Sequence, residues 1–258
     1  MIMNLNFIEY AKIYDAIYKN KDYKQESIYI HRWIQSMNPR AKTLLDLGSG
    51  TGRHCEQLVE LGYDISGIEK SLKMVELAKE RLGDENNNII HGDITNFNLD
   101  QIFDVAISLF HVMNYQVENK DITNVFLETN KHLHMGGIFI FDSWYAPAVL
   151  HLKPEKRITT FASEEFQGVR KSTPIHKINK NIVDVHYEIT LKDKMTNKTS
   201  SISELHSIRY FSIPEISLIA DNYGFTIIKT EEYLTKKEPG IDTWGVCFIL
   251  KKIENINA

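Results

Sequence analysis

Residues 44–52 read Leu-Leu-Asp-Leu-Gly-Ser-Gly-Thr-Gly, a short apolar run that leads directly into three glycines spaced two apart. The apolar run predicts a buried strand, and the glycines permit a tight turn in which a ligand can approach the backbone closely. Residues 53–61 then return to helical spacing, and Gly62 closes that helix. The stretch therefore predicts a strand, a glycine-rich loop and a helix, arranged as in α/β sheets that bind ligands at the carboxyl ends of their strands.

Strands and helices alternate on both sides of this unit. Further strands are predicted at residues 63–68, 88–91, 104–109 and 138–141, the last of them entered through Gly136-Gly137. Helices are predicted at residues 22–37, 72–82 and 121–133. This alternation implies right-handed crossovers and predicts an α/β fold with a doubly wound, mostly parallel sheet.

The rhythm changes after Trp144. Residues 181–191 and 200–211 alternate polar and apolar side chains around the polar turn 194–198, which predicts an inserted antiparallel β hairpin. A helix from Pro214 to Ala220 and strands at 225–229 and 243–251 follow. The expected organisation is an N-terminal helical segment (1–40), an α/β core (41–143), the antiparallel insertion (144–211) and a completion of the core sheet (212–258).

Composition narrows the classes of partner. The chain has 258 residues and a net charge of −4, which gives no general attraction for phosphate backbones, so nucleic acid is not expected to bind. Cys55 and Cys247 are far apart and lack metal-ligand spacing, so neither a disulfide framework nor a metal is expected. The sequence shows no signal-peptide pattern and no membrane-span pattern, so a cytoplasmic location is expected. A homodimer is left open.

The spacing of the glycines distinguishes between two kinds of nucleotide-binding loop. A dinucleotide fold prefers Gly-x-Gly-x-x-Gly, whereas Arg53 occupies the position where its last glycine would stand. With Asp46 ahead of Gly-x-Gly-x-Gly, the stretch resembles the first motif of the class I S-adenosylmethionine-dependent methyltransferases. The resemblance implies a seven-stranded Rossmann-like sheet, S-adenosylmethionine as cofactor and S-adenosylhomocysteine as product.

The same resemblance implies a set of cofactor-binding residues. An acid at the end of the second strand binds both ribose hydroxyls in that family, a role that Glu69 fits because a carboxylate can accept two hydrogen bonds. Asp93 would accept from the adenine amine. The alternative is an ordinary tight turn with unremarkable acids at the strand ends. The implied set in the core is Asp46, Gly48, Ser49, Gly50, Glu69, Lys70, Met74, Gly92, Asp93, Ile94 and Leu109.

Several polar and aromatic residues are candidates on the acceptor side. His111 and Tyr115 follow the fourth strand, at the edge where the methyl group should face the acceptor, and are candidate catalytic residues; a purely structural role is the alternative. Trp144 and Tyr145 end the fifth strand and would form a wall for the acceptor. In the hairpin, Glu204 is a candidate for substrate binding and His206 for catalysis, unless both face solvent.

The beginning of the chain carries a second resemblance. Tyr14-Asp15 and Lys21-Asp22-Tyr23 are similar to the start of the bacterial nucleotide-amino-sugar N-methyltransferases. This implies that an N-terminal helix lids the cofactor, that the antiparallel insertion covers the acceptor sugar, and that Tyr14 and Tyr23 lie near the cofactor, with Tyr14 also a catalytic candidate. Tyr14 and Tyr18 could instead form a buried helical stripe. Those enzymes tend to carry His at the position of Tyr115, whereas His111 stands four residues earlier.

The expected function is methyl transfer from S-adenosylmethionine to a nitrogen or oxygen of a small polar acceptor. A nucleotide-linked or otherwise activated sugar is favoured, for the biosynthesis of a surface glycan such as capsule or lipopolysaccharide or of a glycosylated metabolite. The alternatives are a methyltransferase of another small polar or phosphorylated metabolite, a dinucleotide-binding oxidoreductase, and a noncatalytic cofactor-binding subunit.

Overall fold

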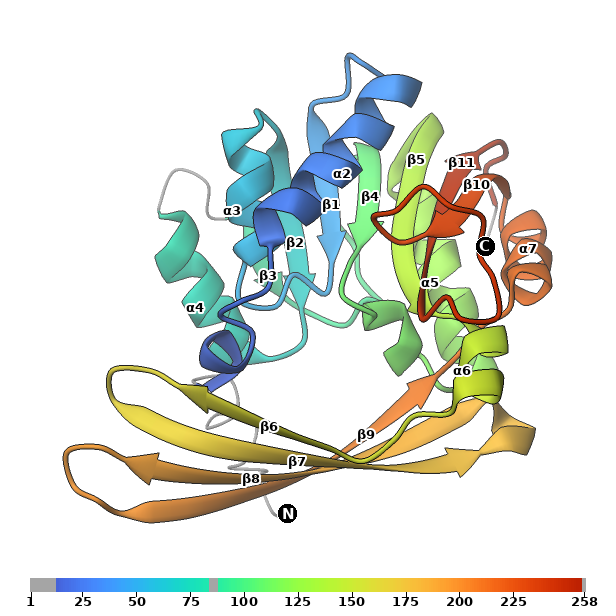
Figure 1. The fold of residues 1–258 in the computed structure, drawn as a ribbon. Coiled ribbons are helices and arrows are strands. Elements are labelled where there is room, and N and C mark those ends of the chain that lie inside the picture. Colours follow the sequence, from blue (N-terminus) through green and yellow to red (C-terminus); the bar gives the residue numbers. More distant parts are fainter. Residues whose placement is uncertain (1–12, 84–87, 257–258) are drawn as a thin grey trace. The chain divides into compact units, whose positions relative to one another are not determined.

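The computed structural model describes residues 13–83 and 88–256, which group into two compact units. The larger unit comprises Asp22–Leu152 and Tyr210–Ala258, and the smaller one comprises Met1–Lys21 and Lys153–Arg209. Figure 1 shows both units. None of the helices within the described residues is long and apolar enough to span a membrane.

The larger unit is built on a seven-stranded sheet with the order β10-β11-β5-β4-β1-β2-β3 (Figure 1). Strands β1 to β5 run parallel, and β11 is antiparallel to both β5 and β10. This confirms the predicted mostly parallel, seven-stranded Rossmann-like sheet. The strands are β1 (Thr43–Leu47), β2 (Asp64–Glu69), β3 (Ile89–His91), β4 (Phe103–Ser108), β5 (Leu133–Trp144), β10 (Phe225–Glu232) and β11 (Gly245–Lys252).

Helices cover both faces of this sheet. On one face, α2 (Tyr23–Met37), α3 (Arg53–Glu60) and α4 (Leu72–Leu82) contribute buried side chains such as Ile30 and Leu58 to one core. On the other, α5 (Asn119–Lys131) and α7 (Ile213–Asn222) bury Phe126 and Ile216 in a second core. The apolar spacing that predicted these helices therefore marks their sheet-facing stripes.

Two local predictions in this unit were wrong. Leu133 begins β5 rather than ending the preceding helix, and the strand runs through Gly136 and Gly137 instead of starting after them. Gly136 has a positive φ of 80°, and the β4–β5 register shifts between Phe103 and Val105, so the glycines form an irregularity within the strand. The short helix α6 (Ala146–Leu152) was not predicted.

The order of the strands brings the predicted site residues to one edge. From β1 the chain proceeds through β2 and β3 on one side and then through β4 and β5 on the other, so the topology switches beside β1 and β4. Gly48, Glu69 and His111 lie at or just beyond the carboxyl ends of β1, β2 and β4. The opposite edge is structural: Asp104 accepts hydrogen bonds from the backbone N–H groups of Lys42 (2.8 Å) and Thr43 (3.1 Å) and so fastens β4 to β1.

The smaller unit contains a four-stranded antiparallel sheet with the order β6-β7-β8-β9. Strands β8 (Ile182–Asp193) and β9 (Thr199–Arg209) are the predicted hairpin, whereas β6 (Arg157–Ala162) and β7 (Phe166–Lys177) were not predicted. Both missed strands are rich in polar side chains, and a proline such as Pro174 within β7 disfavours the prediction of a strand, so the sequence did not indicate either of them. Ile13 packs with Phe161, Ile189 and Ile202 to form the core of this unit.

Candidate functional site

The glycine loop is held in a conformation that requires glycine. Gly48, Gly50 and Gly52 have φ values of 84°, 57° and 76°. A Cβ added to Gly48 would lie only 2.5 Å from Cγ1 of Val112, a residue of the 3-10 helix η2 (Val112–Tyr115) that follows β4. The loop after β1 can therefore lie against the segment after β4 only because Gly48 has no side chain.

Glu69 fastens the loop to the end of β2. Its Oε2 accepts from the backbone N–H of Gly50 (2.9 Å) and its Oε1 from that of Ser71 (2.7 Å). Burial raises the pKa of Glu69 above its ordinary value, although these backbone bonds act to lower it. Each carboxylate oxygen can accept a second hydrogen bond, so the group can still bind ligand hydroxyls.

Two further polar groups of the loop fit a polar ligand. The hydroxyl of Ser49 is buried and has no hydrogen-bond partner among the described residues, which is unusual without a ligand or water. Asp46 is almost fully buried and accepts a hydrogen bond from the Cys55 thiol at 3.1 Å. Burial raises the pKa of Asp46 to about 6, although His54 and the thiol both act to lower it. A buried carboxyl whose pKa is raised in this way is typical of functional sites.

The end of β3 carries the predicted adenine-side residues. The carboxylate of Asp93 accepts from Nζ of Lys70 (2.7 Å) and from the hydroxyl of Thr95 (2.8 Å). Although partial burial acts to raise it, these bonds lower the pKa of Asp93 below its ordinary value. Gly92 donates its N–H to the carbonyl of Glu69 at 3.0 Å, and Ile94 is buried. The strand ends after β2 and β3 are thus directly connected. Of the other predicted cofactor residues, Leu109 is buried and Met74 and Tyr23 are half-buried.

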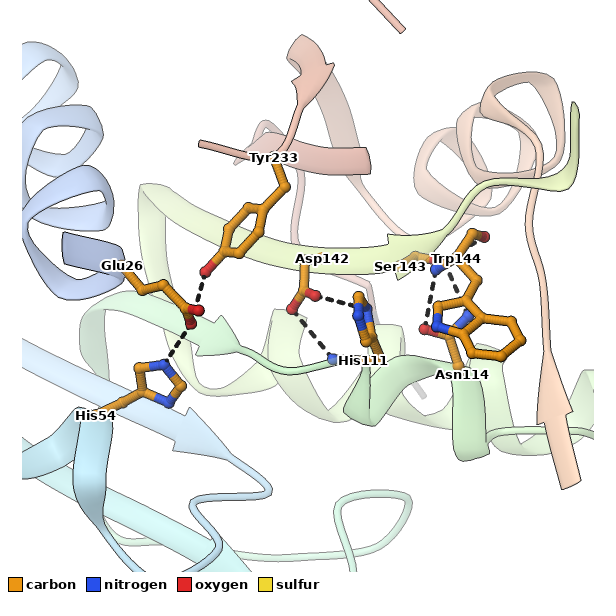
Figure 2. Close-up of polar contacts among 8 residues, drawn as sticks. All are labelled: Glu26, His54, His111, Asn114, Asp142, Ser143, Trp144 and Tyr233. Carbon is orange, nitrogen blue, oxygen red and sulfur yellow. Dashed lines mark hydrogen bonds and ion pairs between the residues drawn. The ribbon is translucent and has the colours of Figure 1, made fainter. Parts of the chain in front are cut away.

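His111 forms a close pair with a buried carboxylate. Its Nδ1 lies 2.7 Å from Oδ2 of Asp142 on β5, and its backbone N–H donates to Oδ1 of the same residue at 3.2 Å (Figure 2). Phe110 and His111 both adopt φ of 63°, an unfavourable region for side chains of this size. Backbone strain of this kind is often found where a turn positions a functional side chain. Asp142 was not identified from the sequence as a partner of His111.

The turn that bears His111 is fastened to the end of β5. Nδ2 of Asn114 donates to the Ser143 hydroxyl at 3.1 Å, and Oδ1 of Asn114 accepts from the backbone N–H of Trp144 at 3.2 Å (Figure 2). The rings of His111 and Trp144 approach edge to face, with centroids 6.5 Å apart. Tyr145 follows in the chain, and Tyr115, at the end of the turn, is 47% exposed. Predicted acceptor-side residues of β4 and β5 therefore come together.

A second acid–imidazole pair was not predicted. Oε2 of Glu26 on α2 lies 2.8 Å from Nε2 of His54 on α3, and the Tyr233 hydroxyl donates to the same oxygen at 3.2 Å (Figure 2). Tyr23 meets the His54 ring edge to face, with centroids 4.9 Å apart. Only the position of His54, directly after the glycine loop, could have indicated this pair from the sequence.

Three predicted residues belong to the smaller unit. His206 lies with Nε2 2.8 Å from Oε2 of Glu204, and both side chains are largely buried, so they are not the solvent-facing pair that the sequence left as an alternative. Tyr14, the third of them, is half-buried, and its ring lies with its centroid 4.8 Å from that of Tyr18.

Comparison with known proteins identifies the family. Residues 44–137, which hold the glycine loop and the ends of β1 to β4, match the family model of the methyltransferase domain. This part of the chain is a methyltransferase domain of the class I, S-adenosylmethionine-dependent type. Its cofactor is therefore S-adenosylmethionine, which becomes S-adenosylhomocysteine, and the dinucleotide oxidoreductase considered from the sequence is excluded.

Several relatives have named activities. A dTDP-3-amino-3,4,6-trideoxy-alpha-D-glucopyranose N,N-dimethyltransferase from Streptomyces venezuelae is 30% identical over 142 residues, which are 54% of this chain and 59% of that one. A dTDP-4-amino-2,3,4,6-tetradeoxy-D-glucose N,N-dimethyltransferase from Saccharopolyspora spinosa is 31% identical over 141 residues, which are 54% and 56% of the two chains. The methyltransferase thus matches little more than half the length of these relatives.

A solved structure extends the similarity of fold to the rest of the chain. The S-adenosylmethionine-bound amino pentose methyltransferase from Micromonospora echinaspora, involved in calicheamicin biosynthesis, superposes with a TM-score of 0.76. The superposition covers 98% of this chain and 100% of that one, at 21% identity. The two proteins therefore share a fold that includes the antiparallel sheet.

Gly48→Ala should weaken cofactor binding more than strain alone explains. The new Cβ would meet Val112, push the loop away from η2 and raise the Kd of S-adenosylhomocysteine by at least about tenfold. Gly62→Ala is the matched control, since Gly62 has a similar φ of 92° but no atom within 4 Å of an added Cβ. Isothermal titration calorimetry measures both, and equal losses in the two variants would contradict the proposed steric cause.

Asp46→Asn should stabilise the cofactor-free methyltransferase at neutral pH. The folded carboxyl has a pKa of about 6 and its ordinary value is 3.8, so ionisation on raising the pH through this window destabilises the native state. The variant should gain on the order of 2 kcal/mol at neutral pH and nothing below about pH 4. Denaturant unfolding across this range measures the difference from the unchanged protein.

Asp104→Asn is a control that should change the stability of the native state in the opposite direction. Although partial burial acts to raise it, the bonds from Lys42 and Thr43 lower the pKa of Asp104, so its ionised form stabilises the native state at neutral pH. That variant should lose stability at neutral pH, and its deficit should shrink in acid. A pH-independent gain in Asp46→Asn would show that ionisation of Asp46 is not the cause.

Proposed function

We propose that the protein transfers a methyl group from S-adenosylmethionine to the amine nitrogen of a small polar acceptor, preferably a nucleotide-linked or otherwise activated amino sugar. The named activities of the two relatives from Streptomyces and Saccharopolyspora support this class of acceptor. The observation that carries the proposal is the pairing of His111 with buried Asp142 beside the glycine loop.

An amine acceptor requires a base at this position. Amines of this kind are protonated near neutral pH and have no lone pair until a proton is removed. Bound S-adenosylmethionine supplies a methyl group activated by its sulfonium. The amine nitrogen gives a proton to Nε2 of His111, then its lone pair forms the new N–C bond while the C–S bond breaks and its electron pair remains on sulfur.

The geometry around His111 supports this assignment. A carboxylate 2.7 Å from Nδ1 favours the tautomer that carries hydrogen on Nδ1, which leaves Nε2 as the acceptor of a proton. The same carboxylate binds the backbone N–H of His111, so ring and main chain are fixed together. The bonds from Asn114 to the end of β5 keep the turn in place, as alignment of the reacting atoms demands.

Direct assay tests the class of acceptor. Purified protein should transfer methyl groups from S-adenosylmethionine to dTDP-linked amino sugars and should leave the matching sugars with a hydroxyl in place of the amine unchanged. Mass spectrometry of the nucleotide sugar counts the methyl groups added. Methylation of the hydroxyl sugars at comparable rates would move the reaction to oxygen, and no transfer to any member of the panel would overturn the proposal.

His111→Ala and Asp142→Asn should lower kcat by on the order of 10²-fold while the Kd of S-adenosylhomocysteine stays within about twofold. The rate of His111→Ala should recover as the pH approaches the pKa of the acceptor, because the amine then loses its proton to solvent. His134→Ala is the control, an exposed histidine at the amino-terminal end of β5. A loss of cofactor affinity equal to the loss of rate would refute the role as a base.

A further inference from the structure

A cavity between α2 and the turn that follows β10 has no part in the proposed reaction. Its volume is about 330 Å³, within the range of about 300–1,000 Å³ that is usual for small-molecule sites. One wall is the first half of α2, and the other is the turn at residues 234–236. Both walls belong to the larger unit, so the cavity is complete within that unit.

Three basic side chains line this cavity. Lys24 and Arg32 belong to α2 and Lys236 to the turn, and all three are exposed. Within the part of the chain that the structure describes, none of them forms an ion pair or a side-chain hydrogen bond. The one acid among the lining residues is Asp22, whose carboxylate caps α2 by accepting from the backbone N–H of Gln25 at 2.8 Å. Three cations therefore face a single carboxylate, and this excess of positive charge suits an anionic ligand.

The cavity also has an apolar part, which surface lysines elsewhere lack. Ile28, Tyr29 and Leu234 line it between the charges, and Tyr29 is buried. The hydroxyl of Tyr29 donates to Oε1 of Glu231 at 2.5 Å, and Nε1 of Trp33 donates to the same oxygen at 3.0 Å, so this stretch of α2 is fixed to β10. Apolar walls lower the local dielectric constant and so strengthen the attraction between the cations and an anion beside them.

The turn that carries Lys236 is held in an unfavourable conformation. Leu234 and Lys236 have φ values of 68° and 63°, in the left-handed region that side chains disfavour. The backbone N–H of Glu232 donates to the carbonyl of Lys237 at 2.8 Å, and the Thr235 hydroxyl donates to Oε2 of Glu232 at 2.7 Å. Backbone strain of this kind is retained where it positions a functional group. The turn therefore holds Lys236 at the cavity before any ligand binds.

The cavity lies beside the edge at which the acceptor is proposed to react. Tyr233 directly precedes Leu234, and its ring meets that of Tyr29 edge to face, with centroids 5.4 Å apart. A Cβ added to Gly245 would lie 3.6 Å from Cβ of Tyr233 and 3.8 Å from Cε1 of His111. Tyr233 and Gly245 thus connect one wall of the cavity to the imidazole of His111.

We propose that this cavity binds the diphosphate group of a nucleotide through Lys24, Arg32 and Lys236. Phosphate oxygens carry negative charge and accept several hydrogen bonds, from an arginine in pairs and from a lysine as a point charge. A neutral sugar or a simple amine has no need of three cations. The assignment rests on the proposed function, because a nucleotide-linked acceptor carries this group, but it does not depend on which atom is methylated.

Binding of dTDP, measured by isothermal titration calorimetry with S-adenosylhomocysteine present, tests this assignment. Arg32→Gln and Lys236→Gln should each raise the Kd of dTDP by about tenfold, because each removes a charge-assisted hydrogen bond to phosphate. Both variants should bind S-adenosylhomocysteine within about twofold of the unchanged protein. Thymidine lacks the phosphates, and its affinity should be equal in all three proteins. Inorganic pyrophosphate should bind more weakly than dTDP, and equal affinity would overturn the assignment to a nucleotide.

Arg40→Gln is the matched control, since Arg40 is an exposed arginine just beyond the carboxyl-terminal end of α2 and outside the cavity lining. It should leave the Kd of dTDP within about twofold. An equal loss in Arg40→Gln, an unchanged affinity in Arg32→Gln and Lys236→Gln, or no binding of dTDP by the unchanged protein would overturn the assignment.

The outcome is separable from that of the acceptor assay, because binding of dTDP requires no methyl transfer. A protein that binds dTDP through Arg32 and Lys236 but methylates no amino sugar keeps this site and loses the proposed reaction. A protein that methylates dTDP-linked amino sugars, and whose two cavity variants bind dTDP normally, keeps the reaction and loses this site.

Discussion

The contact between Gly48 and Val112 governs the rest of the site. Only a residue without Cβ lets the loop after β1 lie against the turn after β4, because the added atom would come within 2.5 Å of Val112. This contact sets the distance between the loop that Glu69 fastens to β2 and the turn that Asp142 fastens to β5. The loop and the turn are thereby held on adjacent strands of one sheet, and such fixed positions favour the alignment of reacting groups.

Two buried carboxylates at the carboxyl-terminal edge of this sheet differ from Asp104 at its amino-terminal edge. At the amino-terminal edge, Oδ2 of Asp104 accepts two backbone N–H groups and the Thr43 hydroxyl, and these bonds hold its pKa low despite partial burial. At the carboxyl-terminal edge, burial outweighs the available partners of Asp46 and Glu69, and their pKa values are raised. The first arrangement stabilises the fold. The second leaves acceptors with unmet capacity, which is what a site needs if a cationic, hydroxyl-bearing ligand is to complete it.

The sequence predicted those elements of the fold that neighbouring residues in the chain specify. The apolar run with its glycines, the helical stripes and the strand-end acids Glu69 and Asp93 all fall where the sequence placed them. The polar pairs could not be predicted in this way, because Glu26 is 28 residues from His54 and 207 from Tyr233, and His111 is 31 residues from Asp142. These residues come together only because of the register of the sheet and because the last strands, β10 and β11, pair beside β5. Strands β6 and β7 were missed because they are rich in polar side chains and β7 contains a proline.

The departure at Tyr115 from the sugar N-methyltransferases now has a physical interpretation. The residue at the position where those enzymes tend to carry His is 47% exposed, whereas His111 at the start of the same turn is paired with a buried carboxylate. The 3-10 turn closes with a hydrogen bond from Asn114 N–H to His111 O at 3.0 Å, so His111 and Tyr115 lie at the two ends of one short turn. Under the proposed reaction the paired imidazole is the better candidate for the base, because Asp142 lies 2.7 Å from its Nδ1 and also accepts from the backbone N–H of His111.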